Sequence, residues 1–115
     1  MPTNEKTKLY EMMLLFRPDL EEQELDSEIK KVEDIITSHG GSVLNLHRWK
    51  KRKLAYPVKG FNEGLYVVCR SSASKRVLGE IDYVLRYNER CLRYLLLDLQ
   101  KHPGMLRRPS EEVSE

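Results

Sequence analysis

The residues most suited to chemistry form a short run of cations bordered by aromatic rings. In order, they are Trp49, Lys50, Lys51, Arg52, Lys53 and, after two small apolar residues, Tyr56. Four consecutive cations are unusual in a strand, because like charges repel and strand positions favour β-branched or aromatic side chains. Lysine and arginine neutralise nucleic-acid phosphates, and aromatic rings stack on unpaired bases. The run therefore predicts a contact with RNA.

A second interpretation of the same run is purely structural. Exposed lysines protect the edge of a sheet from pairing with another chain, so the run would then be a solvated edge strand. Alternation along a strand sends Lys51 and Lys53 to one side, and Lys50 and Arg52 to the other. Neither pair can be buried beneath a helix. Both interpretations therefore require a strand that lies at the sheet edge or projects beyond it.

The net charge of +2, from 20 basic and 18 acidic side chains, hides an uneven distribution along the 115 residues. Residues 1–38 carry five basic and ten acidic side chains, whereas residues 39–109 carry fifteen basic and five acidic ones. Three glutamates follow in residues 110–115. Segregated charge of this kind favours a polyanionic partner on one surface.

No pattern for catalysis or for metal binding accompanies the basic run. His39, His47 and His102 are scattered, and neither Cys69 nor Cys91 belongs to a Cys-x-x-Cys pair or a Cys/His cluster. Each cysteine lies in an apolar segment, which is typical of a small buried side chain in a reducing compartment. We therefore expect no enzyme, no cofactor, no metal and no small-molecule substrate.

Membrane association is not expected either. The apolar runs Met12–Phe16 and Leu95–Leu97 are far shorter than the ~18 residues that span a bilayer. Residues 1–8 are polar, unlike a signal or transit peptide. These features place the protein in the cytoplasm, or in an organelle after processing.

Hydrophobic periodicity indicates which elements position these residues. Alternation predicts four strands, over residues 8–16, 42–58, 65–70 and 91–99. Helical spacing predicts one helix that Asp19 and Glu22 cap and that Gly40 ends. A second helix follows a serine-rich break at residues 71–74 and ends near Tyr87.

The order of these elements, β-α-β-β-α-β, predicts the fold. It is the α+β, ferredoxin-like split βαβ arrangement, with a four-stranded antiparallel sheet and two helices on one face. Residues 1–100 form a single domain in this interpretation. Residues 101–115 are expected to be a flexible tail.

Helices cover only one face of such a sheet. Alternation assigns to the covered face Tyr10, Met12, Leu14, Phe16, Leu65, Val67, Cys69, Leu92, Tyr94 and Leu96. It assigns to the open face Glu11, Met13, Leu15, Tyr66, Val68, Arg93, Leu95 and Leu97. Glu11 and Arg93 are expected to pair there. A monomer rarely exposes so much apolar surface, so the open face predicts a protein partner, unless long side chains or the tail shield it.

The basic run also carries a family resemblance. Arg52-Lys53-Leu54-Ala55-Tyr56-Pro57, followed by a polar loop, Gly64 and Tyr66, resembles the signature of the small-subunit ribosomal protein six family of bacteria and organelles. Weaker similarities agree in order over residues 8–99; they are Tyr10-Glu11, Arg17-Pro18-Asp19-Leu20, Gly40-Gly41, Leu85-Arg86 and Leu92-Arg93. The chain departs from the family in the extra charge of Lys50-Lys51 and in the segment Arg107-Arg108-Pro109-Ser110.

The resemblance implies a non-enzymatic role in the small ribosomal subunit. Members of the family bind 16S-type ribosomal RNA in the central, or platform, domain together with small-subunit protein eighteen. Arg52, Lys53 and Arg86 match basic positions of the family. The expected RNA-binding set is then Trp49, Lys50, Lys51, Arg52, Lys53, Tyr56 and Arg86. Protein eighteen on the open face is our own inference, and its expected contacts are Met13, Leu15, Tyr66, Val68, Arg93, Leu95 and Leu97.

Two other functions fit the same topology. A single-strand RNA reader of the RRM type would stack bases on the open face, where Tyr66 is the only aromatic residue expected. A ferredoxin-like regulatory domain would bind a small ligand and would not need the run Lys50–Lys53. An enzyme on this fold would need an anion-binding glycine loop, which residues 59–64 do not supply.

Overall fold

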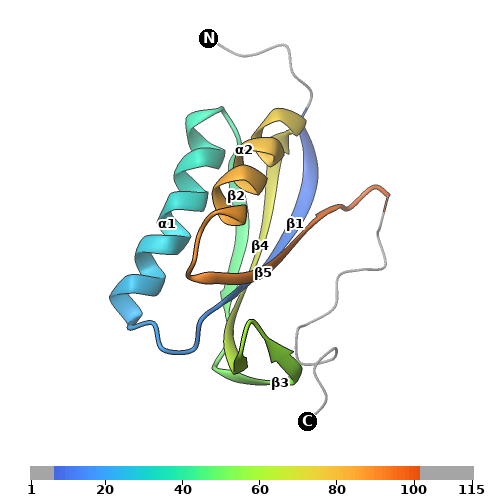
Figure 1. Ribbon diagram of the computed structural model, residues 1–115. Helices are drawn as coiled ribbons and strands as arrows, with labels where there is room; N and C mark the ends of the chain where they lie inside the picture. Colours follow the sequence, from blue (N-terminus) through green and yellow to red (C-terminus); the bar gives the residue numbers. More distant parts are fainter. Residues whose placement is uncertain (1–6, 102–115) are drawn as a thin grey trace.

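The computed structural model describes residues 7–101 (Figure 1). Its elements follow in the order β1 (Thr7–Phe16), α1 (Glu22–Ser38), β2 (Ser42–Arg48), β3 (Arg52–Val58), β4 (Phe61–Ser74), α2 (Lys75–Arg86) and β5 (Cys91–Asp98). The expected flexible tail lies outside the described residues, apart from Lys101. His102 and the Arg107-Arg108 pair lie outside them as well.

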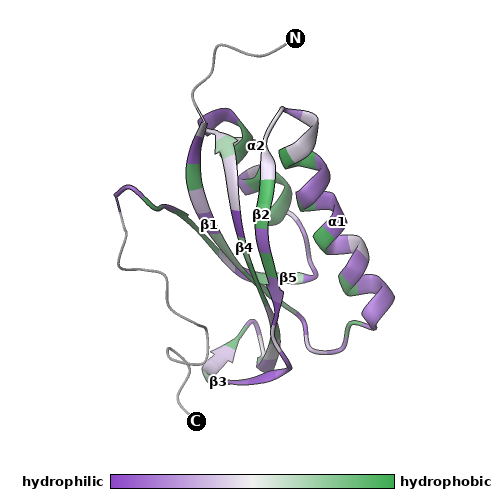
Figure 2. Cartoon of the chain, turned by 180° about the vertical axis from the view of Figure 1, so that it is seen from behind, coloured by the Kyte–Doolittle hydropathy of each residue, from purple (hydrophilic) through white to green (hydrophobic). Residues whose placement is uncertain are grey.

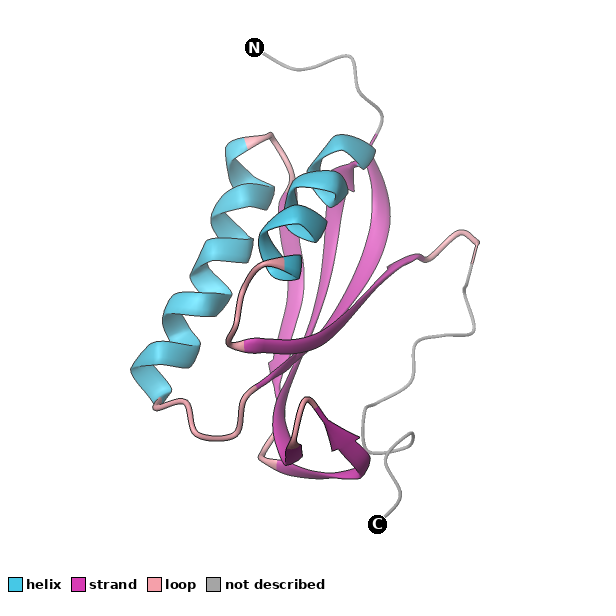
Figure 3. Ribbon diagram, in the orientation of Figure 1, coloured by secondary structure: helices cyan, strands magenta, loops and turns pink. Residues whose placement is uncertain are grey.

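The strands form one antiparallel sheet in the order β2-β4-β1-β5, with β3 paired to the beginning of β4. Both helices lie on the same face of this sheet, as Figure 3 shows by colour. The first strand of the sequence is therefore central, between β4 and β5. This arrangement confirms the predicted ferredoxin-like α+β fold.

The predicted strand 42–58 is in fact two strands, so the sheet has five strands and not four. Arg48 pairs with Val67, and Arg52 pairs with Gly64, so three residues oppose two across this step. The extra residue interrupts the ladder and bends the chain, as a bulge does. As a result, β3 lies apart from the rest of the sheet at one end (Figure 1).

Two other boundaries differ from the prediction. Residues 71–74 are not a break, because β4 continues through Ser74 along its pairing with the start of β1. Helix α1 begins two residues later than expected: Glu24 accepts a 2.9 Å hydrogen bond from the backbone N–H of Glu21. Asp19 instead pairs with Arg17, at 2.9 Å. The sequence rule favours aspartate over glutamate as a cap, so it pointed to Asp19, but in the structure that carboxylate pairs with Arg17 and Glu21 takes the cap position.

The core lies between the helices and the covered face. Met12, Leu14 and Phe16 of β1 are almost completely buried against residues of both helices. The helix residues of this cluster are Leu25, Ile29, Val32 and Ile36 of α1, and Val77, Ile81 and Leu85 of α2. Tyr10, Val67 and Cys69 belong to it as predicted, and Leu65, Tyr94 and Leu96 pack against it.

Leu92 is the exception among the residues predicted for the covered face. Leu92 is buried, but it does not belong to the core cluster beneath the helices; its neighbour Cys91 does. The register between β1 and β5 shifts between Leu15 and Phe16, so that Phe16 pairs with Cys91 while Leu15 pairs with Arg93. A shift of one residue exchanges the two faces of a strand, and the sequence pattern does not reveal where such a shift occurs.

Candidate nucleic-acid and partner interfaces

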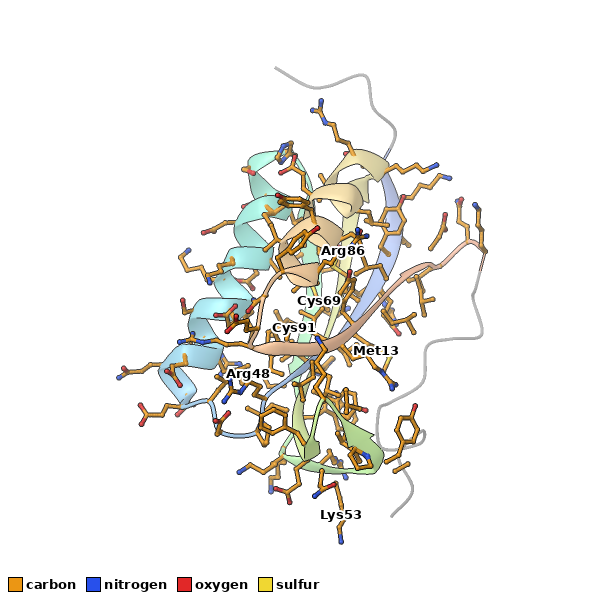
Figure 4. All side chains as sticks on the ribbon, viewed as in Figure 1. Met13, Arg48, Lys53, Cys69, Arg86 and Cys91 are labelled. Atoms are coloured by element: carbon orange, nitrogen blue, oxygen red, sulfur yellow. The ribbon has the colours of Figure 1, made fainter. Side chains whose placement is uncertain are left out.

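The turn between β2 and β3 presents exposed cations at one end of the sheet. Lys50, Lys51 and Lys53 are exposed, and Lys53 points away from the body of the protein in Figure 4. We call residues 49–53 the basic turn. The preceding cation, Arg48, is not part of it, because its guanidinium is ion-paired with Asp26 of α1. The turn lies beyond the helical layer, as both interpretations of the sequence required.

Trp49 and Arg52 form the base of the basic turn. The backbone N–H of Trp49 donates a 2.9 Å hydrogen bond to the carbonyl of Tyr66, which anchors the turn to β4. The guanidinium carbon of Arg52 lies 5.5 Å from the centre of the indole ring. Both side chains are half-buried. This cation–π contact leaves less of the indole face for a base.

Tyr56 does not join the basic turn, although the sequence placed it in the RNA-binding set. Alternation along β3 puts it on the same side as Leu54 and Val58, facing the open side of the sheet. Its hydroxyl accepts a 3.0 Å hydrogen bond from Arg93 of β5. The structure thus brings Tyr56 together with the residues expected to bind a protein.

Arg86 is also separate from the basic turn. It lies at the end of α2, well away from Lys53 in Figure 4. Its guanidinium forms a 2.6 Å ion pair with Asp82, and Asp82 also accepts a 2.6 Å hydrogen bond from the hydroxyl of Tyr94. The contacts with Tyr94 and Asp82 raise the pKa of Arg86, so the side chain keeps its charge. The seven expected RNA-binding residues therefore occupy three places and not one.

The open face is less exposed than its sequence suggests. Met13, Leu15 and Leu97 are buried in the monomer, Tyr66 and Val68 are half-buried, and Leu95 remains 43% exposed. Figure 2 shows this face from behind, with no helix in front of β2, β4 and β1. Shielding by the chain's own side chains therefore accounts for part of the face, and Leu95 is one of the large apolar side chains that stay exposed on it.

Two shallow grooves mark this face, and Leu15, Tyr66 and Arg93 line both of them. The first groove adds Leu54, Ala55, Tyr56 and Val58 of β3, and the second adds Met13, Tyr94 and Leu95. Gly64 makes the first groove possible: a Cβ at that position would collide with the Leu15 side chain and come within 3.2 Å of the Phe16 carbonyl. The close approach of β4 to Leu15 at Gly64 is thus part of the structure beneath the groove.

The predicted pair between Glu11 and Arg93 does not form. Glu11 is opposite Leu97 on β5 and Arg70 on β4, whereas Arg93 is opposite Leu15. The buried Glu11 carboxylate instead lies 3.5 Å from the guanidinium of Arg70. The prediction was wrong because it identified the shared face correctly but not the register along the strands.

Sequence reasoning missed a polar cluster on the helical side. Glu28 of α1 is only 2% exposed, and its carboxylate accepts hydrogen bonds from Asn88 (2.6 Å), Arg90 (3.0 Å) and Lys31 (3.3 Å). Arg90 also bonds to Glu24. Burial alone would raise the pKa of Glu28, but these donors outweigh it and lower the pKa. The cluster joins residues about 60 positions apart, so no local sequence pattern predicts it. Arg90 is therefore tied to two carboxylates of α1, and is not simply a cation in solvent.

The sequence favoured neither metal binding nor insertion into a membrane. Between residues 7 and 101, no three side chains among histidine, cysteine, aspartate and glutamate are grouped as they would be around a metal ion. In the same residues, neither helix combines the length and the apolar character needed to cross a membrane.

Comparison with known proteins identifies the family. A family model described as Ribosomal protein S6 matches residues 9–98. A small ribosomal subunit protein bS6 from Desulforudis audaxviator is 40% identical over 88 residues, which are 76% of this chain and 94% of the relative. A bS6 from Geotalea daltonii is 33% identical over 109 residues, which are 94% of this chain and 85% of the relative.

A solved structure agrees with these relatives. The crystal structure of the 30S ribosomal protein S6 from Thermotoga maritima matches with a TM-score of 0.76 at 28% sequence identity, over 90% of this chain and 100% of that one. The resemblance carried by the motif at residues 52–57 is therefore confirmed. The chain belongs to the ribosomal protein S6 family, which makes it a protein of the small ribosomal subunit and not an enzyme.

Proposed function

We propose that this protein binds small-subunit ribosomal RNA, of the 16S type and in its central domain, through the basic turn. The observation that carries the proposal is the exposure of Lys50, Lys51 and Lys53 on one projecting turn. Arg52 supports the turn from beneath by its contact with Trp49. Clustered cations outside the helical layer can reach the phosphates of a structured RNA without moving the sheet.

The test is the salt dependence of RNA binding. Each phosphate contact contributes about 0.9 to the slope of log K against log salt, so Lys50→Ala with Lys53→Ala should lower the slope by about 2. A matched control, Lys30→Ala with Lys101→Ala, removes the same charge from exposed residues elsewhere. An equal fall in slope for both double variants would show that net charge, and not the basic turn, determines the binding.

We also propose that the open face binds small-subunit protein eighteen. The two adjoining grooves and the exposed Leu95 support this assignment. Leu95→Glu should abolish binding of the partner protein and leave the fold intact. Leu44→Glu is the control, because Leu44 is similarly exposed, at 49%, and lines neither groove. Loss of binding in both variants would contradict the assignment.

The other two functions considered from the sequence are less well supported. An RRM-type reader stacks bases on aromatic rings of the central strands, but Tyr66 of β4 is half-buried, and the exposed Tyr56 belongs to β3 at the end of the sheet. Family membership speaks against a regulatory ligand-binding domain. We further propose a bacterial ribosome in the cytoplasm as the site of action, since the relatives named above come from bacteria and none of them is organellar.

A further inference from the structure

Two exposed tyrosines lie together on the outer face of α2. Tyr83 is 66% exposed and Tyr87 is 68% exposed, and their ring centroids are 5.2 Å apart in an edge-to-face arrangement. The core side of this helix is complete without them, since Val77, Ile81 and Leu85 are buried. Helix positions that face water usually carry charged or small side chains, and a pair of rings four residues apart contributes only weakly to helix stability.

Gly79 stands one helical turn before Tyr83 on the same side. A Cβ at this position would meet no atom within 4 Å, so no neighbour requires a glycine there. Glycine in a helix interior also destabilises the helix relative to alanine. Because Gly79 has no side chain, the surface of the helix is open one turn before Tyr83. A flat ligand could therefore approach the tyrosine rings from the Gly79 side.

Arginines occupy both ends of this part of the helix. Arg86 lies between the two tyrosines in sequence, and Arg76 lies ten residues earlier, about 15 Å along the helix axis. The two acids of α2 each contact another side chain: Glu80 lies 2.8 Å from His39, and Asp82 pairs with Arg86 and accepts a hydrogen bond from the Tyr94 hydroxyl. Asp82 thereby holds Arg86 beside the rings, and the Arg86 side chain stays 58% exposed, so it can still contact an anionic ligand.

We propose that this tyrosine–arginine stripe, Arg76, Gly79, Tyr83, Arg86 and Tyr87, is a second RNA-binding surface that stacks unpaired bases of ribosomal RNA. Aromatic rings that alternate with cations are the usual chemistry for unpaired nucleotides, whose bases stack while their phosphates are neutralised. The proposal accounts for the position of Arg86 far from the basic turn. It rests on the RNA binding proposed above, but on none of the residues of the basic turn.

The test compares stacking with charge in the full chain. Tyr83→Ala with Tyr87→Ala should weaken binding to a dye-labelled transcript of the small-subunit central domain by roughly five- to a hundredfold, with the salt slope unchanged. Tyr83→Phe with Tyr87→Phe keeps the rings and should remain within about twofold of the wild type. Both variants should unfold at the wild-type denaturant midpoint, or at a higher one, because the two side chains are exposed.

The outcomes separate this proposal from the one on the basic turn. If the double alanine variant binds the transcript with wild-type affinity, the stripe is not an RNA-binding surface. That result would not affect the proposal on the basic turn. Weak binding by both the alanine and the phenylalanine variants would also overturn the proposal on the stripe, because stacking does not need the hydroxyls. Normal binding to the naked transcript, with loss of incorporation only into subunits that already contain other proteins, would assign the stripe to a protein contact instead.

Discussion

The guanidinium of Arg93 in β5 donates a 3.0 Å hydrogen bond to the hydroxyl of Tyr56 in β3, and its carbon lies 5.8 Å from the centre of the tyrosine ring. Strand β3 pairs with β4 alone. This contact is therefore a second attachment that holds β3 against the open face. It also connects the strand that follows the basic turn with the proposed protein surface.

Removing this attachment should loosen β3 without unfolding the domain. We expect Arg93→Ala to accelerate amide hydrogen exchange over residues 52–58, and Tyr56→Phe to have a smaller effect because the ring contact remains. The free energy of unfolding should fall by less than about 1 kcal/mol, since the contact is exposed. Exchange within α2 is the internal control. Unchanged exchange in β3 would mean that its pairing with β4 suffices.

The two glycines in regular structure should respond in opposite directions to alanine. Gly64→Ala places a methyl group against Leu15 and should destabilise the protein by about 1–3 kcal/mol, as overpacking does. Gly79→Ala meets nothing and should stabilise α2 by about 0.5–1 kcal/mol. Chemical denaturation of both variants measures the difference. The same sign for both would contradict the packing described at Gly64.

The Glu28 cluster should make stability depend on acid. The pKa of Glu28 is lower in the folded protein than its usual value of 4.5, so the unfolded chain binds its proton more readily. The stabilisation is therefore present above pH 4.5 and is lost as the pH falls through the lowered value. Glu28→Gln should lower the free energy of unfolding by about 1.5–3 kcal/mol at pH 7. It should also remove the part of the loss of stability below pH 4.5 that Glu28 causes. An unaltered pH profile in the variant would exclude Glu28 as its source.

Both thiols should be unreactive until the chain unfolds. Burial raises the pKa of Cys69 and of Cys91 to about 11, so that little thiolate exists at pH 8. Modification by an aromatic disulfide reagent should then follow the unfolding transition in denaturant. A thiol that reacts rapidly in native buffer would show that the covered face opens locally around it.

The two faces of the sheet were predictable because their physical basis is local. A strand turns successive side chains to opposite faces, and Met12, Leu14 and Val67 obey that period. The helical stripe of Leu25, Ile29, Val32 and Ile36 is equally local and equally correct. These patterns also determine the order of the elements, from which the fold follows.

Features that depend on pairing between distant residues were not predictable. The division of residues 42–58 into β2 and β3 results from the register against β4, and the exchange of Leu92 for Cys91 results from the register against β1. The bonds of Arg90 to Glu28 likewise join residues brought together only by folding. For the same reason, the sequence grouped Tyr56 and Arg86 with the basic turn, whereas the fold places each elsewhere.

The central position of β1 has a consequence for how the protein is made. Its partners are residues 65–74 on one side and 91–98 on the other, so a nascent chain emerges with the middle of its sheet first. Until residues 91–96 have been synthesised, one edge of the apolar segment 12–16 has no strand beside it. Such an edge invites association with other chains. The sheet can therefore be completed only after β5 has been translated, and the unpaired edge of β1 is exposed throughout the synthesis of the segments between them.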